Sequence, residues 1–299
     1  MGVAFKEIAL KRGFMLKLFG NRKTGNKLTT RDRIIYAALI TVGLFLVTAA
    51  SVDLIWGRRE YAIAETEYSN LIEQYPVMSA YMADVRRALA LDDDFVAPDA
   101  GIPLPGSVDG NQRDLTGGAD PEDIPDPLAG LTELNPDFIA WLSIEDVLEY
   151  PVVRGRNNDY YLNRTFTGER NSSGAVFMDY RCREGFDEPI CIIYGHNMRN
   201  GSMFASLHGY RDTQFMADHP YIIIVTSTGD VLVYRVFATG INEADDILSR
   251  LRQTRDLSTD PVFRRAPEGS DRFLILSTCT RSTNDNERLR IYAALVGAV

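Results

Sequence analysis

Phe273-Leu-Ile-Leu-Ser-Thr-Cys279 has the short, apolar and β-branched composition of a buried strand. Eight residues, 280–287, separate Cys279 from Arg288, and a second apolar run follows at 289–295. Two strands joined by so short a connection form an antiparallel hairpin. The hairpin places the thiol of Cys279 and the guanidinium of Arg288 side by side at one edge of a sheet.

Similar short runs, bounded by turn residues, continue along the chain from residue 135 onward. Together with the hairpin they make eight predicted strands: 138–144, 150–153, 175–178, 190–194, 221–226, 231–238, 273–278 and 289–295. Eight short strands at such spacing predict a β-barrel or a sandwich. Helical segments are predicted at 203–210 and at 243–255, where acids at the start and an arginine at the end suit the helix dipole. The fold class is therefore mainly β.

The chain has three histidines, and His196 is the best placed of them for chemistry. It follows an apolar strand directly after Gly195, which lets the backbone turn, so the imidazole can face a cleft at the strand end. His208 lies in a predicted helical segment, and His219 precedes a proline. For these two we expect a surface or packing role.

A thiol, an imidazole and a guanidinium at one sheet edge suit nucleophilic catalysis. A nucleophilic cysteine needs a basic or cationic neighbour, because its ordinary pKa near 8.5 leaves little thiolate at neutral pH. Arg288 keeps its charge and can stabilise an oxyanion or hold a carbonyl group. Arg290 shares its strand face, and we interpret it as a solvated or ion-paired side chain. One cysteine with one histidine still fits several classes of cysteine enzyme.

The other cysteines leave two alternatives open. Cys182 and Cys191 either form a disulfide, or Cys191 is a small buried hydrophobic residue. Three histidines and three cysteines without close spacing predict no metal site and no cofactor. The acids at 92–94 and 120–126 are interpreted as a solvated loop rather than a calcium site.

Several further motifs occur in one order along the chain, and together they resemble the sortase family, class B in particular. They are Asn135-Pro-Asp-Phe-Ile-Ala-Trp-Leu142, Tyr150-Pro-Val-Val153, Asn158-Asp-Tyr-Tyr-Leu-Asn163, Gly174-Ala-Val-Phe-Met-Asp179, Tyr194-Gly-His-Asn-Met198, Gly201-Ser-Met-Phe204, His219-Pro-Tyr-Ile222 and Leu276-Ser-Thr-Cys279. Arg288, five residues before Ala293, resembles the family's second signature. The resemblance implies an eight-stranded sortase-type β-barrel, N-terminal helices packed on it, and a helix between strands six and seven.

The resemblance also implies a mechanism, transpeptidation without a cofactor. Cys279 would attack a sorting signal near the C-terminus of a surface protein and form a thioacyl intermediate. His196 would act as general acid and base, and Arg288 would stabilise the oxyanion. The acceptor would be an amine of a cell-wall precursor or of a pilin subunit, at the surface of a Gram-positive cell. Three further residues have an expected substrate-binding or supporting role, or else a purely structural one: Asn197, Ser277 and Thr278.

Charge is distributed unevenly along the chain. Residues 1–33 carry nine Lys or Arg and two acids, whereas the whole chain has a net charge of −9. The acidic bulk argues against a nucleic-acid partner. The uncharged run at 34–52, with Trp56 just beyond it, predicts one membrane-spanning helix over 34–56 that contacts the lipid bilayer. The basic leader places the N-terminus in the cytoplasm and the remaining chain outside the cell.

These observations divide the chain into five parts. They are a basic cytoplasmic tail at 1–33, the transmembrane helix at 34–56, a helical extension at 57–91, an acidic proline-rich linker or loop at 92–128, and the catalytic barrel at 129–299.

Two other functions remain open from the sequence. The first is a cysteine hydrolase of wall peptides, although in papain-like enzymes the cysteine precedes the histidine, and here His196 precedes Cys279. The second is a non-catalytic membrane protein that only binds sorting signals.

Overall fold

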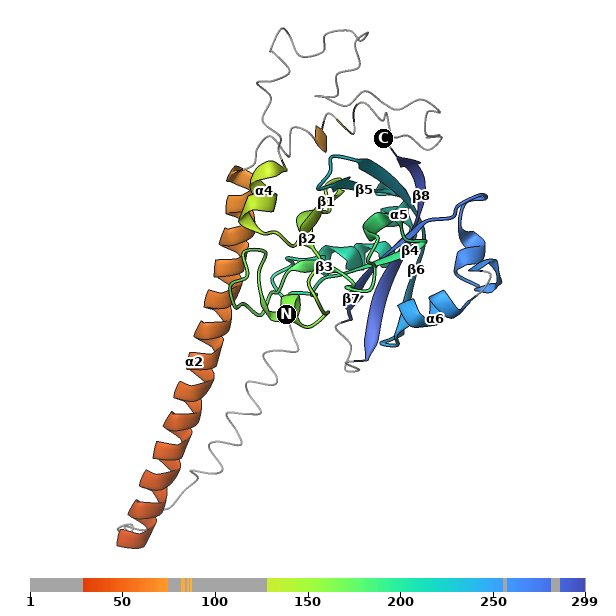
Figure 1. Cartoon of the computed structure of the whole chain (residues 1–299). Coiled ribbons are helices and arrows are strands. Elements are labelled where there is room, and N and C mark those ends of the chain that lie inside the picture. The colour runs from red at the N-terminus through yellow and green to blue at the C-terminus, as the bar shows by residue number, and fades with distance from the viewer. Residues whose placement is uncertain are drawn as a thin grey trace. The chain divides into compact units, whose positions relative to one another are not determined.

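A computed structural model describes residues 29–74, 82, 83, 85, 87, 128–254, 257–280 and 286–298 (Figure 1). The chain divides into two compact units, Met1–Trp56 and Gly57–Val299. Most of the predicted tail, at 1–28, and the predicted linker at 92–127 with its acidic clusters lie outside the described residues.

The second unit is built on a closed β-barrel, which confirms the barrel prediction over the sandwich. The strands are β1 Phe138–Ile144, β2 Leu148–Val153, β3 Val176–Met178, β4 Ile190–Tyr194, β5 Tyr221–Thr226, β6 Val231–Glu243, β7 Phe273–Cys279 and β8 Glu287–Ala298. They close in the order β1-β2-β3-β4-β7-β8-β6-β5. Neighbours are antiparallel, apart from the parallel pairs β2 with β3 and β4 with β7.

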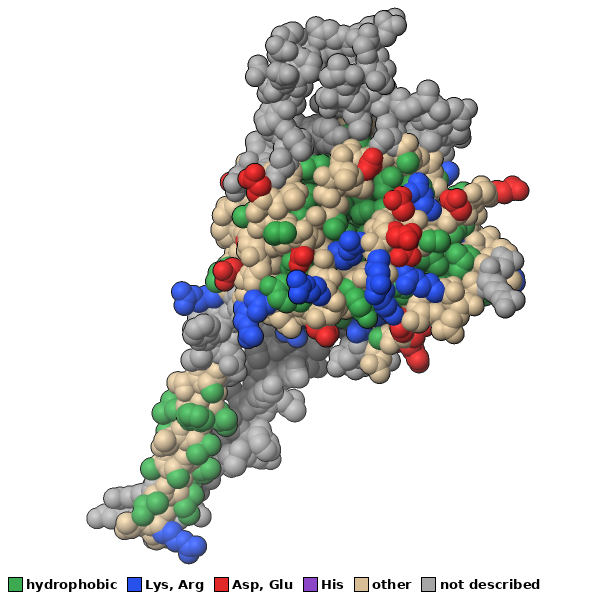
Figure 2. All heavy atoms as spheres, viewed as in Figure 1, with side chains coloured by type: hydrophobic (Ala, Val, Ile, Leu, Met, Phe, Trp, Pro, Cys, Tyr) green, Lys and Arg blue, Asp and Glu red, His purple; other side chains and the backbone are tan. Residues whose placement is uncertain are grey.

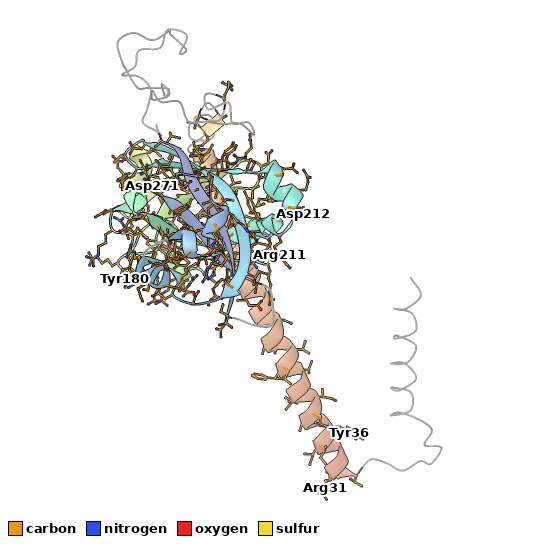
Figure 3. All side chains as sticks on the ribbon, turned by 90° about the vertical axis from the view of Figure 1, so that its right-hand side faces the viewer. Arg31, Tyr36, Tyr180, Arg211, Asp212 and Asp271 are labelled. Carbon is orange, nitrogen blue, oxygen red and sulfur yellow. The ribbon has the colours of Figure 1, made fainter. Side chains whose placement is uncertain are left out.

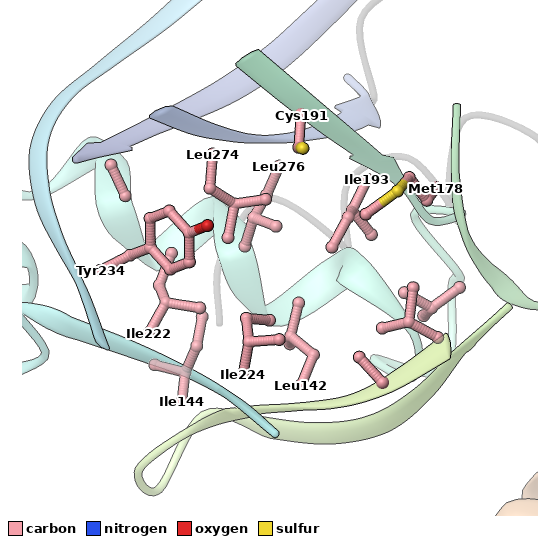
Figure 4. Close-up of a cluster of buried hydrophobic side chains, with 14 of the residues drawn as sticks. Leu142, Ile144, Met178, Cys191, Ile193, Ile222, Ile224, Tyr234, Leu274 and Leu276 are labelled. Atoms are coloured by element: carbon pink, nitrogen blue, oxygen red, sulfur yellow. The ribbon is translucent and has the colours of Figure 1, made fainter. Parts of the chain in front are cut away.

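Alternate residues of the strands fill the barrel, as the two-residue period of a strand requires. Figure 4 shows these side chains pointing toward one another from opposite walls, among them Leu142, Ile144, Ile193, Ile222, Ile224, Leu274 and Leu276. Because Leu274 and Leu276 point inward, the residues of opposite parity on β7, Ser277 and Cys279, lie on its outer face. The nucleophile candidate therefore sits outside the core.

Short helices connect and cover the strands. They are α4 Ala129–Leu134, η2 Tyr160–Asn163, η3 Gly185–Asp187, η4 Phe204–Arg211, α5 Thr213–Asp218, α6 Ile247–Gln253, η5 Leu257–Thr259 and η6 Phe263–Arg265. The predicted helix at 203–210 is the 3-10 helix η4, and α6 is the predicted helix between strands six and seven. At the junction labelled by Arg211 and Asp212 in Figure 3, the Asp212 carboxylate caps α5 by accepting from Gln214 N and Phe215 N.

Several predicted boundaries differ from the observed ones, most of all around β6 and β8. β6 runs to Glu243 and β8 begins at Glu287, so both strands are longer than their apolar runs. Their polar ends pair with each other through Asn242 opposite Arg288 and Glu243 opposite Glu287. The helix expected from residue 243 therefore starts only at Ile247, where the Asp246 carboxylate accepts from Ser249 N.

Helix α2, Thr30–Gln74, precedes the barrel in the chain, and its final turns contact the barrel. Tyr68 Oη donates to Gly174 O over 3.0 Å, and its ring meets the edge of Tyr150 at a centroid distance of 5.3 Å. The Glu67 carboxylate accepts from the backbone and the hydroxyl of Thr167. The expectation of an N-terminal helix packed on the barrel is thus met over these turns.

The predicted membrane-spanning segment at 34–56 is helical, as part of α2. Among the described residues, no helix is both long enough and apolar enough to cross a membrane.

Candidate active site

The hairpin of β7 and β8 brings two of the predicted site residues together. Cys279 lies directly opposite Arg288 in the antiparallel ladder, and Thr280 N donates to Glu287 O to close the pairing. Cys279 is a free, half-buried thiol. Arg288 is half-buried as well, and its Nη1 donates to Glu287 O over 3.0 Å. The juxtaposition predicted from the sequence is confirmed.

The parallel pairing of β4 with β7 brings His196 to the same end of the barrel as Cys279 and Arg288. Tyr194 lies opposite Ser277, and Gly195 N donates to Ser277 O over 3.3 Å. His196 and Cys279 each lie two residues beyond that pair, so both follow it toward the same end of the barrel. The His196 ring lies 2.8 Å from Leu162 O through Nε2. A carbonyl only accepts, so Nε2 carries a proton and Nδ1 is the nitrogen left to exchange one.

Two glycines allow close packing around His196. A Cβ on Gly195 would lie 2.6 Å from the ring of Phe204, so only glycine lets η4 approach the turn before His196. Gly174 has φ +60°, and a Cβ there would lie 3.0 Å from His196 Cδ2 and 2.7 Å from Tyr161 O. Both positions fall within the sequence motifs quoted above.

Asn197 contacts the segment of the candidate nucleophile directly. Its Nδ2 donates to the carbonyl oxygen of Cys279 over 3.0 Å. His208 joins them, which the sequence did not predict: its Nε2 lies 2.9 Å from Asn197 Nδ2 and 3.2 Å from Cys279 O. The ring of the third histidine, His219, packs against Phe215 at a tilt, in line with the surface or packing role expected for it.

Ser277 and Thr278 are buried and differ in orientation. Ser277 lies on the face of Cys279, opposite Arg290 on β8. Thr278 belongs to the inward face, and its Oγ1 has no hydrogen-bond partner within the described part of the chain. Of the two, only Ser277 is on the side of the sheet where the thiol lies.

Arg290 was expected to be either solvated or ion-paired, and the structure shows the ion pair. Its side chain is 2% exposed, and Nη2 donates to Asp245 Oδ1 over 2.7 Å and to Glu243 O over 3.2 Å. Partial burial of the Asp245 carboxyl raises its pKa, but Arg290 outweighs burial and the net pKa is lowered. The Arg290–Asp245 pair holds the start of the β6–β7 connection against the outer face of β8.

A second charged cluster holds β4 near His196. The buried Asp179 carboxylate accepts from Tyr194 Oη, from Asn158 Nδ2 and from Nε and Nη2 of Arg181. Arg181 Nη1 also donates to Asp246 at the beginning of α6. Asp179 stands at the end of a quoted motif, but no sequence pattern indicated that Arg181 would link it to α6.

The remaining cysteines are free thiols, so the disulfide alternative is not realised in the structure. Cys191 is 1% exposed within the barrel, which confirms its interpretation as a small buried residue, and its Sγ donates to Gly185 O.

Comparison with known proteins agrees with this geometry. The family model described as the Sortase domain matches residues 142–296. The chain belongs to the sortase family. It is 33% identical over 190 residues to sortase B of Listeria monocytogenes, covering 58% of this chain and 76% of that protein. The sortase is therefore a cysteine transpeptidase with class B relatives.

Two solved structures are similar to this sortase. A mutant form of Clostridium perfringens sortase B has a TM-score of 0.51 at 25% identity, over 57% of this chain and 86% of that one. A class B sortase of Streptococcus pyogenes, involved in pilus biogenesis, has a TM-score of 0.50 at 28% identity, over 56% of this chain and 96% of that one.

Proposed function

We propose that this sortase cleaves the C-terminal sorting signal of a surface protein and joins the new C-terminus to an amine. The observation that carries the proposal is the arrangement at one end of the barrel: Cys279 lies opposite Arg288, and His196 follows β4 two residues after Tyr194, which pairs with Ser277. Each of the three groups has a role in acyl transfer that its position supports.

The proposed first step is attack of the Cys279 thiolate on a carbonyl of the sorting signal. A C–S bond forms, and the tetrahedral oxyanion lies within reach of the Arg288 guanidinium. His196, protonated at both nitrogens, then donates the Nδ1 proton to the departing amine. Its Nε2–H keeps the hydrogen bond to Leu162 O. The C–N bond breaks and a thioester remains. In the second step an incoming amine returns a proton to His196 and displaces the thiolate.

The acceptor amine is proposed to belong to a cell-wall precursor peptide or to a pilin lysine. The class of the chemistry is the same for both, because each presents an uncharged amine to the thioester. The similarity to the Streptococcus pyogenes sortase, which is involved in pilus biogenesis, favours testing both acceptors together.

The experiment incubates the full chain with a library of sorting-signal peptides, with and without wall-precursor and lysine amines. We expect a thioacyl adduct on Cys279 by mass spectrometry, and a product whose formation depends on added amine. A product that is only the free acid, at a rate indifferent to amine, would instead establish the cysteine hydrolase. An adduct that never forms although peptide binds would establish a binding protein without turnover.

Arg288 offers a prediction that separates charge from geometry. Arg288→Lys keeps the charge but loses the planar donor pair that can span an oxyanion, so we expect kcat to fall by about 10²-fold. Steady-state kinetics with a matched peptide measure it. Arg211→Lys, on an exposed part of η4, is the control and should retain kcat. A lysine variant with unchanged kcat would show that Arg288 only contributes charge.

We also propose that residues 34–56 anchor the enzyme to the membrane with the barrel outside. The support is the charge contrast of the sequence together with large apolar side chains along this part of α2 that are 62–69% exposed (Figure 2): Ile34, Leu39, Ile40, Leu44 and Phe45. An anchor near membrane-held substrates would raise their effective concentration. Extraction of cell membranes with alkaline carbonate tests it: the chain should stay in the pellet, and release to the supernatant would refute the anchor.

A further inference from the structure

The carbonyl of Cys279 lies where the β4–β7 ladder ends. In a parallel ladder the bond after Gly195 N to Ser277 O would run from the backbone N–H of residue 197 to Cys279 O. The backbone of Asn197 instead pairs with Met203 in an isolated bridge. The side-chain amide of Asn197 takes that place in the ladder, donating to Cys279 O over 3.0 Å.

His208 completes this arrangement from η4. Its Nε2 is 2.9 Å from Asn197 Nδ2 and 3.2 Å from Cys279 O. An amide nitrogen can only donate a hydrogen bond, and a carbonyl oxygen can only accept one. His208 Nε2 can therefore bond to one group when it carries a proton and to the other when it does not. Without a proton, Nε2 accepts from the second hydrogen of the Asn197 amide. With a proton, Nε2 donates to Cys279 O. Either state ties the imidazole to the backbone of the nucleophile.

The same short helix is tied to the proposed general acid. Phe204 N, at the start of η4, donates to His196 O over 2.9 Å. His208 lies about one turn further along η4 and contacts the Cys279 segment. η4 therefore bonds to the backbones of both His196 and Cys279, and it bridges the two residues independently of the ladder.

We propose that His208 is a positioning residue for the transpeptidation. It holds Asn197 and the Cys279 carbonyl, and through η4 it fixes the separation of the thiol from the His196 imidazole. The inference rests on the proposed function of Cys279 and His196. It adds a residue that acts through the backbone of the nucleophile and not on the reacting atoms.

Removal of the ring nitrogen should therefore reduce the rate of the chemical steps. For His208→Leu we expect kcat to fall about tenfold, since small misplacement of reacting groups is costly, while KM for the peptide changes little. In His208→Gln the amide oxygen can accept from Asn197 and the amide nitrogen can donate to Cys279 O. This variant should recover most of kcat. The double variant Asn197→Leu with His208→Leu should lose less kcat than the product of the two single losses, because both side chains act on the carbonyl of Cys279.

The experiment uses the full chain and compares these variants with His219→Leu, which removes a histidine that packs against Phe215. It measures kcat and KM per folded molecule, and the rate at which iodoacetamide alkylates Cys279, read by mass spectrometry. Alkylation needs no sorting signal, so it tests His208 even if no peptide is turned over. We expect slower alkylation and lower kcat for His208→Leu, and recovery of both for His208→Gln.

Two results would overturn the inference. One is His208→Leu with kcat and alkylation rate equal to those of His219→Leu. The other is His208→Gln no better than His208→Leu, which would mean that the ring only fills space. Failure of the proposed function is recognised separately: the unaltered chain would then form no amine-dependent product, while the alkylation rates would still test His208.

Discussion

Cys279→Ala should abolish transpeptidation, with kcat at least about 10³-fold lower than that of the unaltered enzyme. The thiol is the group at this barrel edge that can carry the acyl chain, because Arg288 and His196 have no sulfur with which to form a thioester. Peptide binding should persist, since the barrel edge keeps its backbone and its charges. The measurement is amine-dependent product formation, together with the mass of the protein after incubation with peptide.

The stability of the variant should stay near that of the unaltered chain. Cys279 is half-buried at the end of β7, so removal of its sulfur opens no enclosed cavity in the barrel. Cys182→Ala is the matched control: that thiol is fully buried, so its loss should lower stability by about 1 kcal/mol while activity per folded molecule remains. Turnover and an acyl adduct in Cys279→Ala would remove the nucleophile from the mechanism.

The barrel was predictable because strand signals in this chain are local. The runs at 138–144, 190–194 and 221–226 match β1, β4 and β5 at both ends, since apolar residues facing the core define them. The ends of β6 and β8 carry polar residues and are stabilised by pairing with each other. No apolar pattern marks such a pairing, so the predicted strand stops at 238, and residue 243 falls in the predicted helix.

The site was predictable to the extent that hairpin geometry and strand order determine it. The pairing of Cys279 with Arg288 was expected because a short connection joins two strands that form an antiparallel hairpin. His208 did not follow, because its contact with Cys279 depends on the path of η4 from Asn197 back to β7, 71 residues away in sequence. The burial of Arg290 likewise depends on Asp245, which reaches it from a connection that carries no sequence signal for its position.

Asp179→Ala should have the largest effect on stability among the charged residues near the site. The carboxylate is fully buried and is bonded to Arg181, Asn158 and Tyr194, so its removal leaves an arginine and two other donors without this acceptor. Loss of one partner of such a cluster costs about 3 kcal/mol of unfolding free energy. Urea denaturation at pH 7 measures it. Asp187→Ala, which breaks a surface pair with Arg272 where the aspartate is 83% exposed, should change stability by less than about 1 kcal/mol.

The stabilisation of the fold by Asp179 should decrease at acidic pH. Burial raises the pKa of its carboxyl, but hydrogen bonds from Arg181 and Asn158 outweigh burial and hold the pKa below its ordinary value. A lowered pKa in the folded state means that the carboxylate stabilises the fold above its unfolded pKa of about 4 and loses that contribution as the pH falls through the folded value. The stability difference between the unaltered chain and Asp179→Ala should therefore be constant from about pH 7 to about pH 5 and shrink below about pH 4.

A stability difference that stayed constant into that acid range would show that Asp179 acts by packing and not by charge. A shrinking difference would show that Asp179 stabilises the fold as a charged carboxylate, and Tyr194, two residues before His196, is one of its hydrogen-bond donors. The same carboxylate would then support both the fold and the placement of the general acid, because Tyr194 is the residue of β4 that pairs with Ser277 beside the nucleophile.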